Sequence, residues 1–255
     1  MLDPIRRQLL QRLADFQHAG IDFLPRVDGP PPDFGFDESA SERVPEDTGE
    51  STTHPDRRRL ELQQIAQRVS QCVRCPELAS TRTQTVFGVG PLDAELCFVG
   101  EAPGADEDRT GEPFVGEAGK LLDRIIAAMG LKREEIYICN VLRCRPPGNR
   151  TPKPDEIENC REYLEGQLDL IRPKFICALG LPAAQTILRN KLSLVKMRGQ
   201  FHNYKGIPVI CTYHPAYLLP HRFPENKKLV WDDMKMLLQK MGRPIPSSGA
   251  NKPAS

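Results

Sequence analysis

Short apolar runs alternate with amphipathic stretches over most of this 255-residue chain. The apolar runs predict strands at residues 95–99, 136–141, 174–179 and 208–212. The amphipathic stretches predict helices at residues 58–72, 119–129, 154–171, 182–189 and 226–241. Strands that alternate with helices form a parallel sheet covered by helices on both faces. The sequence therefore predicts an α/β fold.

The two ends of the chain differ from this alternating region. Residues 1–24 have a helical pattern, with an apolar face made of Ile5, Leu9, Leu10 and Leu13. Residues 25–56 are rich in Pro, Gly, Ser and acidic side chains, which predicts a disordered acidic linker. Residues 242–255 are rich in Pro and Ser and predict a disordered tail. The globular domain is thus expected to comprise residues 57–241.

The charge of the chain is unevenly distributed. Residues 28–56 contain nine acidic residues and one arginine, and because the whole chain carries +1, the remaining residues carry +9. A basic body is compatible with a nucleic-acid partner. A solvated surface joined to an acidic linker has the same charges, and charge alone favours this simpler interpretation.

Neither a membrane span nor a signal peptide is expected. No run of 18 or more apolar residues occurs, and the N-terminus lacks a continuous apolar segment followed by a cleavage site. We therefore expect a cytoplasmic protein. Because disulfides are rare in the cytoplasm, the eight cysteines need another explanation.

A glycine-rich stretch, GEAPGADEDRTGEPFVGEAG, follows the first predicted strand at residues 100–119. Such a stretch between a strand and a helix is where many α/β proteins bind phosphate. Its glycines match neither the Walker spacing nor the dinucleotide fingerprint. Its six acidic residues would also repel a phosphate. The stretch is therefore predicted to be a loop with a different task.

Ligands of parallel α/β folds bind at the carboxyl ends of the strands. Four segments occupy these positions here. They are GEAPG after the first strand, Asn140 at the end of the second, Gly180 after the third and Tyr213-His214-Pro215 after the fourth. We expect the functional site to be built from them.

The cysteines form two groups. Cys97, Cys139, Cys177 and Cys211 lie inside predicted strands and are expected to be small buried apolar residues. The other group consists of Cys72 and Cys75, in a Cys-x-x-Cys motif, with Cys144 and Cys160. Four cysteines outside the core predict a site with four thiolate ligands, for which zinc and a [4Fe–4S] cluster are equally compatible with the spacing. A redox Cys-x-x-Cys is the third alternative.

Such a site would fix the basic loop RCRPPGNRTPK that contains Cys144. We expect this loop to face a DNA backbone through Arg143, Arg145, Arg150 and Lys153.

Three motifs together resemble the family 4 uracil-DNA glycosylases, the iron–sulfur branch of that superfamily. They are GEAPG-x-x-E-D-x-x-G-x-PFVG-x-AG-x-LL at residues 100–122, NVLRCRPPGNRTP at 140–152 and HPAYLL at 214–219. The resemblance covers residues 57–241. It implies a three-layer αβα sandwich with a four-stranded parallel sheet and an N-terminal segment that helps to bind the cluster. It also implies that a [4Fe–4S] cluster, rather than zinc, is bound by Cys72, Cys75, Cys144 and Cys160.

The resemblance also assigns residues that would bind a flipped uracil base. Phe114 would stack on the base, and the Asn140 amide would distinguish uracil from cytosine by donating to O4 and accepting from N3–H. Gly100 would let the backbone approach the base. The backbone amides of Glu101 and Ala102 would contact it.

The catalytic residues implied by the resemblance are His214, Glu101 and Glu107. His214 would donate a hydrogen bond to uracil O2 as negative charge develops. Glu101 would orient the water nucleophile and offset the positive charge of the sugar, assisted by Glu107. Leu218 is either a wedge that fills the space left by the flipped base or a leucine that packs a helix, and the sequence favours neither.

The resulting hypothesis is a monomeric, monofunctional uracil-DNA glycosylase that acts on single- or double-stranded DNA and starts base excision repair. One alternative is a uracil-trapping protein that becomes covalently attached to DNA through a histidine. The matching region here, LVKMRGQFHNYKG, resembles an ordinary family 4 loop, so His202 is a poor candidate for that nucleophile. Another is a non-catalytic iron–sulfur or zinc DNA-binding module. For this module, residues 1–24 are a candidate contact with a protein partner such as a polymerase.

Overall fold

The computed structural model describes residues 54–246. The predicted helix at residues 1–24, nearly all of the predicted linker and most of the predicted tail lie outside the described residues. None of the helices in the described part combines the length and the apolar character that a membrane crossing requires.

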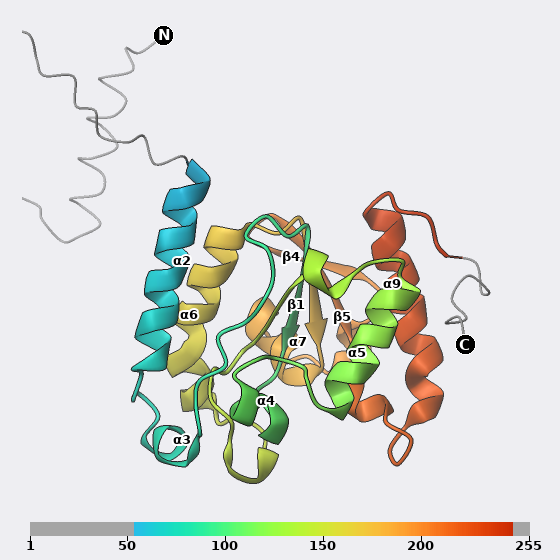
Figure 1. The fold of residues 1–255 in the computed structure, drawn as a ribbon. Helices are drawn as coiled ribbons and strands as arrows, with labels where there is room; N and C mark the ends of the chain where they lie inside the picture. The colour runs from blue at the N-terminus through green and yellow to red at the C-terminus, as the bar shows by residue number, and fades with distance from the viewer. Residues whose placement is uncertain (1–53, 247–255) are drawn as a thin grey trace, which may run out of the picture. The chain divides into compact units, whose positions relative to one another are not determined.

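The core of the fold is a sheet with the strand order β2-β1-β3-β5-β4. The parallel strands are β1 (Leu96–Gly100), β2 (Tyr137–Asn140), β3 (Phe175–Leu179) and β5 (Ile207–Thr212). They correspond to the four strands predicted from the apolar runs. Their carboxyl ends lie at the lower edge of the sheet in Figure 1.

The sheet has a fifth strand that the sequence pattern did not predict. β4 (Phe201–Tyr204) pairs antiparallel with β5 at one edge. The two strands are joined by Lys205 and Gly206, which both have positive φ angles, of 48° and 89°, as the tightest hairpin turns require. Asn203 stabilises this turn by accepting a hydrogen bond from the Gly206 amide at 3.0 Å. The polar edge sequence FHNY lacks the apolar character by which the other strands were recognised.

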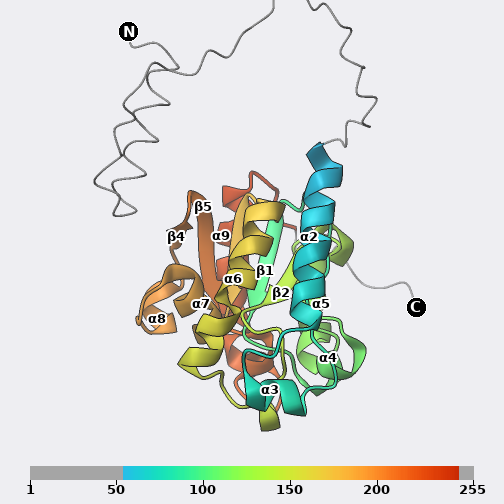
Figure 2. The ribbon, with the colours of Figure 1, turned by 90° about the vertical axis from the view of Figure 1, so that its left-hand side faces the viewer.

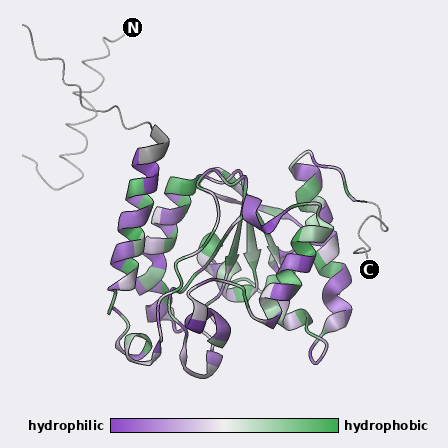
Figure 3. Ribbon diagram, in the orientation of Figure 1, coloured by the Kyte–Doolittle hydropathy of each residue, from purple (hydrophilic) through white to green (hydrophobic). Residues whose placement is uncertain are grey.

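Helices cover both faces of the sheet, so the predicted three-layer αβα sandwich is confirmed (Figures 1 and 2). One buried cluster packs under α2 (His54–Ser70), α6 (Pro154–Ile171) and α7 (Leu181–Leu188). The other packs under α5 (Glu117–Ala128) and α9 (Lys227–Lys240). Figure 3 shows the strands as mostly hydrophobic between helices that carry hydrophilic residues.

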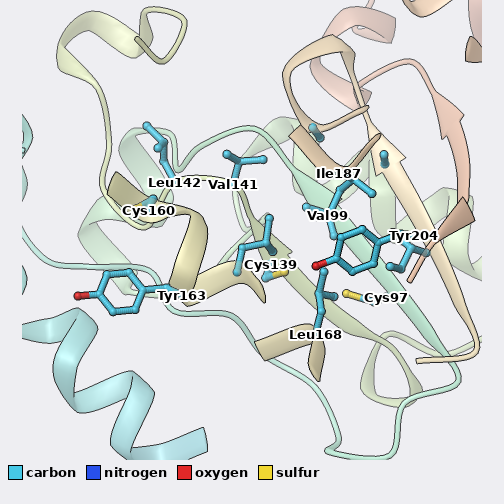
Figure 4. Packing of buried hydrophobic residues seen from close by; sticks show 14 of the residues in the cluster. Cys97, Val99, Cys139, Val141, Leu142, Cys160, Tyr163, Leu168, Ile187 and Tyr204 are labelled. Atoms are coloured by element: carbon cyan, nitrogen blue, oxygen red, sulfur yellow. The ribbon is translucent and has the colours of Figure 1, made fainter. Parts of the chain in front are cut away.

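The two clusters divide the strand residues by their alternation. Cys97 and Val99 of β1 belong to the first cluster, whereas Leu96 and Phe98 belong to the second. The four strand cysteines are completely buried, as expected for small apolar side chains; they are Cys97, Cys139, Cys177 and Cys211. Figure 4 shows Cys97 and Cys139 among the apolar side chains of the first cluster.

Several short helices connect these elements. The glycine-rich stretch is not a loop throughout, because it contains α4 (Ala105–Thr110). The other short α-helices are α3 (Pro76–Thr81) and α8 (Leu194–Met197). Single 3-10 turns occur at η1 (Arg133–Glu135), η2 (Pro147–Asn149), η3 (Pro215–Leu218) and η4 (Pro224–Asn226).

A buried ionic group joins β5 to α9. The Asp233 carboxylate accepts hydrogen bonds from the Thr212 hydroxyl at 2.6 Å and from the Arg198 guanidinium at 2.9 Å. The side chain of Asp233 is 1% exposed and that of Arg198 is 15% exposed. Removal of one partner would therefore leave the other charge buried without compensation.

We predict that Asp233→Ala lowers the free energy of unfolding by about 3–5 kcal/mol. The matched control is Asp232→Ala, which removes a carboxylate that is 41% exposed and paired with Lys235. Exposed pairs contribute at most about 1 kcal/mol, so this control should unfold almost like the wild type. Denaturant titration of both variants measures the difference, and equal effects would contradict the argument.

Candidate active site

A pocket of about 610 Å³ opens at the carboxyl ends of β1 and β2. Its walls come from the segment after β1, the end of β2, the loop between β2 and α6, and η3. Six of the seven predicted substrate-binding and catalytic residues line it: Glu101, Ala102, Glu107, Phe114, Asn140 and His214. The seventh, Gly100, contributes space rather than a wall.

At Gly100, the end of β1 lies close to side chains of the site that come from β2 and from the segment after β1. It lies beside Asn140 in the parallel register of β1 and β2. A Cβ atom on Gly100 would lie only 2.6 and 2.7 Å from Cζ and Cε2 of the Phe114 ring, and closer still to Asn140 Oδ1. Only glycine therefore allows both side chains to occupy their observed positions.

Phe114 forms one wall of the pocket in a strained backbone conformation. Its φ angle is +56°, which a bulky residue rarely adopts. Its ring is 5.4 Å from the His214 ring, and the two planes differ by 30°. Gly119 leaves room for its main chain, because any Cβ atom on Gly119 would overlap the Phe114 carbonyl group. Backbone strain of this kind is often retained where a side chain must be aimed.

Glu107 fixes the segment that carries Phe114. One carboxylate oxygen accepts hydrogen bonds from the amides of Val115 and Gly116, both at 2.9 Å. The other accepts from the Gly104 amide at 3.0 Å. The carboxylate thus ties the start of α4 to the residues that follow Phe114. The predicted catalytic assistance by Glu107 stays a prediction, while its contacts are those of a positioning residue.

Asn140 lines the pocket and has an unpaired acceptor. The residue is 2% exposed, and among the described residues its Oδ1 atom has no hydrogen-bond partner. A buried amide oxygen without a partner is rare and unfavourable, unless a ligand supplies the missing donor. The Asn140 carbonyl is itself fixed, because it accepts a hydrogen bond from the buried Arg143 guanidinium.

His214 caps η3 with its own ring. The Nδ1 atom accepts a hydrogen bond from the Ala216 amide at 3.1 Å, which requires the neutral tautomer with the proton on Nε2. Burial is the main reason that the pKa of His214 is lowered to about 4; the Arg222 charge lowers it further and Glu107 opposes the shift. A neutral ring with a free Nε2–H can donate to a developing anion.

Glu101 follows Gly100 at the pocket wall. Its side chain is half-buried, and burial raises the pKa of its carboxyl above the ordinary value. Among the described residues its carboxylate forms no hydrogen bond, so it is available to a ligand or to water. Its main chain is held by the Leu142 amide, which donates to the Glu101 carbonyl at 3.0 Å.

The remaining four cysteines come from three segments. Cys72 and Cys75 lie between α2 and α3, Cys144 follows β2, and Cys160 lies in α6. Burial raises the pKa of Cys144, and the charges of Cys72 and Cys75 add to the shift, as expected for thiols that lie near one another. Within residues 54–246, no three ligand side chains are grouped closely enough to bind a single metal ion.

Two polar groups point at these sulfur atoms. An Arg82 N–H donates to Cys144 Sγ at 3.1 Å, and the Asn159 amide donates to Cys75 Sγ at 3.6 Å. Donors around sulfur stabilise the thiolate form that binds metals.

The basic loop differs from the prediction. Arg143 is 1% exposed and therefore cannot face a DNA backbone; its guanidinium is held by the Asn140 carbonyl and the Gln167 side chain. Arg150 forms ion pairs with Glu77 and Glu156, at 3.1 and 2.6 Å. Arg150, together with Asn149 and Thr151, lines the pocket, which the sequence did not indicate.

The rest of the loop is held in a similar way. Lys153 forms an ion pair with Glu77 at 2.7 Å, and Arg145 donates to Asn149 at 2.7 Å. Of the two interpretations of Leu218, the structure supports the packing leucine and not the wedge, because the residue is 1% exposed and packs in the core cluster with α5. Arg222, an exposed residue at the pocket wall, was not predicted.

We predict that the His214 ring titrates near pH 4, well below its ordinary value of 6.5. Because the folded ring binds a proton less readily than the unfolded chain does, its contribution to stability falls as the pH drops from 6.5 towards 4. An NMR titration of the imidazole protons measures this, with His214→Asn to assign the resonance. A His214 signal that titrates above pH 6 would contradict the burial argument.

Comparison with known proteins agrees with this geometry. The sequence profile described as "Uracil DNA glycosylase superfamily" matches residues 87–235. The type-4 uracil-DNA glycosylase of Thermotoga maritima is 45% identical over 180 residues, 69% of this chain and 93% of that protein. That of Archaeoglobus fulgidus is 43% identical over 194 residues, 73% of this chain and 96% of that protein. On these matches and on the pocket that its motifs build, the chain belongs to the type-4 branch of the uracil-DNA glycosylase superfamily.

Proposed function

We propose that this chain removes uracil from DNA by hydrolysing the N-glycosidic bond of deoxyuridine, the step that starts base excision repair. The names of the type-4 relatives support this activity. The observation that supports it most strongly is the buried, unpaired Oδ1 atom of Asn140, a residue that lines the same pocket as the Phe114 ring.

The pocket has the parts needed to hold a uracil base that has left the helix stack. The Phe114 ring offers a flat apolar face on which the base stacks. Asn140 Oδ1 accepts from uracil N3–H, and its amide N–H donates to O4. Cytosine has an acceptor at N3 and a donor at C4, so both pairs would fail and leave buried polar groups unpaired.

The departing base is stabilised by His214. As the bond between the sugar C1′ and uracil N1 breaks, its electron pair moves onto the base, and negative charge develops on O2. The neutral His214 ring donates its Nε2 proton in a hydrogen bond to that oxygen without giving the proton up. The low pKa of His214 keeps the ring in this form at neutral pH.

Glu101 acts on the sugar side of the bond. Its ionised carboxylate offsets the positive charge of the oxocarbenium-like sugar and orients a water molecule towards C1′. The water oxygen forms the new bond to C1′, and its proton passes to the carboxylate. Glu107 acts indirectly, because its two oxygens are already occupied by three backbone amides that position Phe114.

The residues that line the pocket favour hydrolysis of the glycosidic bond over Schiff-base chemistry, covalent trapping of DNA and non-catalytic DNA binding. No lysine lines it in the described part of the chain, so there is no amine to form a Schiff base with the abasic sugar. His202, the nucleophile of the uracil-trapping hypothesis, lies in β4 with its Nε2 atom 2.7 Å from the Met197 carbonyl, and it does not line the pocket. A purely DNA-binding module would not need the catalytic groups that converge here.

We further propose that Cys72, Cys75, Cys144 and Cys160 hold a [4Fe–4S] cluster. Four cysteine thiolates are the usual ligands of such a cluster. The N–H donors of Arg82 and Asn159, which contact Cys144 Sγ and Cys75 Sγ, suit thiolate ligands. When bound, the cluster would serve as a structural cross-link between the α2–α3 turn and the loop after β2. That loop supplies Asn149, Arg150 and Thr151 to the pocket wall.

Uracil-containing DNA, single- or double-stranded, is the proposed substrate. The positively charged remainder of the chain and the exposed Arg222 are consistent with it. The monomeric state, the cytoplasmic location and a protein partner for residues 1–24 stay predictions.

The proposed activity predicts release of free uracil from an oligonucleotide that contains it, with no release of thymine from a matched strand. Asn140→Asp loses the amide N–H that donates to O4, so uracil release should fall at least about 100-fold. Asn190→Asp, which lies away from the pocket and accepts from the Leu192 amide, is the matched control. Absence of uracil release by wild-type protein that contains its cofactor would overturn the proposal.

The proposed cofactor predicts about four iron and four sulfide per chain in protein purified without air. Cys144→Ser should lose most of this iron, whereas Cys177→Ala, which removes a buried strand cysteine, should keep it. Elemental analysis together with the visible absorption spectrum measures the outcome. One equivalent of zinc with no iron would contradict the cluster.

A further inference from the structure

We propose that the exposed face of Phe223 stacks on the nucleobase next to the flipped uridine, so that the segment containing Phe223 contacts the DNA beside the flipped nucleotide. The inference rests on the proposed function and names a substrate contact that the pocket alone does not provide. The partner is the flat face of a DNA base, whatever its identity.

Phe223 ends a ladder of aromatic rings. The Tyr213 and Tyr217 rings stack with centroids 5.1 Å apart and planes 16° apart. The Tyr217 and Phe223 rings stack at 4.4 Å and 27°. The Arg198 guanidinium lies 5.3 Å from the Tyr213 ring at the inner end of the ladder. Phe223 lies at the outer end of the ladder and is 45% exposed. Its ring has one aromatic stacking partner, Tyr217, although a ring can stack on both of its faces.

The backbone holds the outer ring in place. The Phe223 amide donates to the Tyr217 carbonyl at 3.1 Å, and the Arg222 amide donates to the Leu219 carbonyl at 2.9 Å. The segment between η3 and α9 is thus closed on itself by main-chain hydrogen bonds. A ring that is already oriented loses little conformational entropy when a base stacks on it.

The ladder lies at the mouth of the pocket. Ala216 and Arg222, which adjoin Tyr217 and Phe223 in the sequence, both line the pocket. Figure 1 shows the segment before α9 and the α4 segment at the same lower end of the sheet. Leu218 faces the core, so among the residues considered for this task only Phe223 offers an exposed apolar face.

The charges around Phe223 suit a nucleic acid. Residues 220–228 contain Arg222, Lys227 and Lys228 against the single acid Glu225, which gives a net charge of +2. Positive side chains beside an exposed aromatic ring are the usual combination in surfaces that bind DNA bases without sequence preference. When uridine leaves the stack, the neighbouring base loses a stacking partner, and the Phe223 ring replaces it.

The test compares four variants of the full-length protein that contain the cofactor. Binding is measured on DNA with 2′-fluoro-2′-deoxyuridine, whose glycosidic bond resists cleavage. Phe223→Ala should bind about 5- to 100-fold more weakly, the loss of one base–aromatic stack. Phe223→Leu, which keeps an apolar side chain without a flat ring, should also be impaired, and Phe223→Trp should bind like the wild type. Leu192→Ala is the matched control, because Leu192 is also 45% exposed but does not line the pocket.

A second measurement separates stacking from a loss of local structure. The base on the 5′ or the 3′ side of the uridine is replaced by an abasic residue. If Phe223 stacks on that base, one of the two substrates should weaken wild-type binding and remove the difference between wild type and Phe223→Ala. The proposal is overturned if Phe223→Ala or Phe223→Leu binds like the wild type. It is also overturned if the difference persists on both abasic substrates.

The outcome is independent of the proposed chemistry. If the wild type released no uracil but its affinity for DNA still depended on the Phe223 ring, the proposed function would fail while the stacking surface would stand. If uracil release were normal and binding did not depend on the ring, only the stacking surface would fail.

Discussion

The close approach of β1 and β2 at Gly100 is the constraint on which the site depends. Because Gly100 has no side chain, the Phe114 ring and the Asn140 amide can both lie against the end of β1. The strained Phe114 backbone fits because Gly119 leaves room for it, and it is held by the Glu107 carboxylate, which binds the amides of the next two residues. The glycines and Glu107 of residues 100–119 thus position the Phe114 ring. This role explains why the stretch has a composition unsuited to phosphate binding.

A second constraint concerns two polar side chains of the pocket, Asn140 and His214, each of which keeps one hydrogen-bonding atom available for a ligand. Asn140 keeps a buried acceptor without a partner, and His214 keeps a free Nε2–H because the Ala216 amide occupies Nδ1. The unpaired acceptor of Asn140 is unfavourable by itself, and both groups can form hydrogen bonds with a ligand of the complementary pattern. Under the proposed function, Asn140 would supply the specificity and His214 the stabilisation of the leaving group.

Much of the architecture followed from the sequence, because continuous apolar runs identify buried parallel strands and strand ends locate the ligand site. β4 was missed because its edge position leaves FHNY largely polar. Arg143 was misassigned, and Leu218 was left between two interpretations, because their burial depends on distant partners, Gln167 in α6 and the packing of η3 on α5. Such contacts join segments far apart in the chain, so no local pattern reports them. The positioning role of Glu107 was missed for a different reason: its partners lie only three to nine residues away, but in an irregular segment where no periodic pattern indicates hydrogen bonds.

The central claim is that uracil stacks on the Phe114 ring, that Asn140 recognises the base and that His214 stabilises it as it departs. A crystal structure of the protein with bound uracil tests it most directly. The account predicts the base stacked on Phe114, with N3 within about 3 Å of Asn140 Oδ1 and O2 within about 3 Å of His214 Nε2. Uracil bound outside this pocket, or bound in it with N3–H turned away from Asn140, would contradict the account.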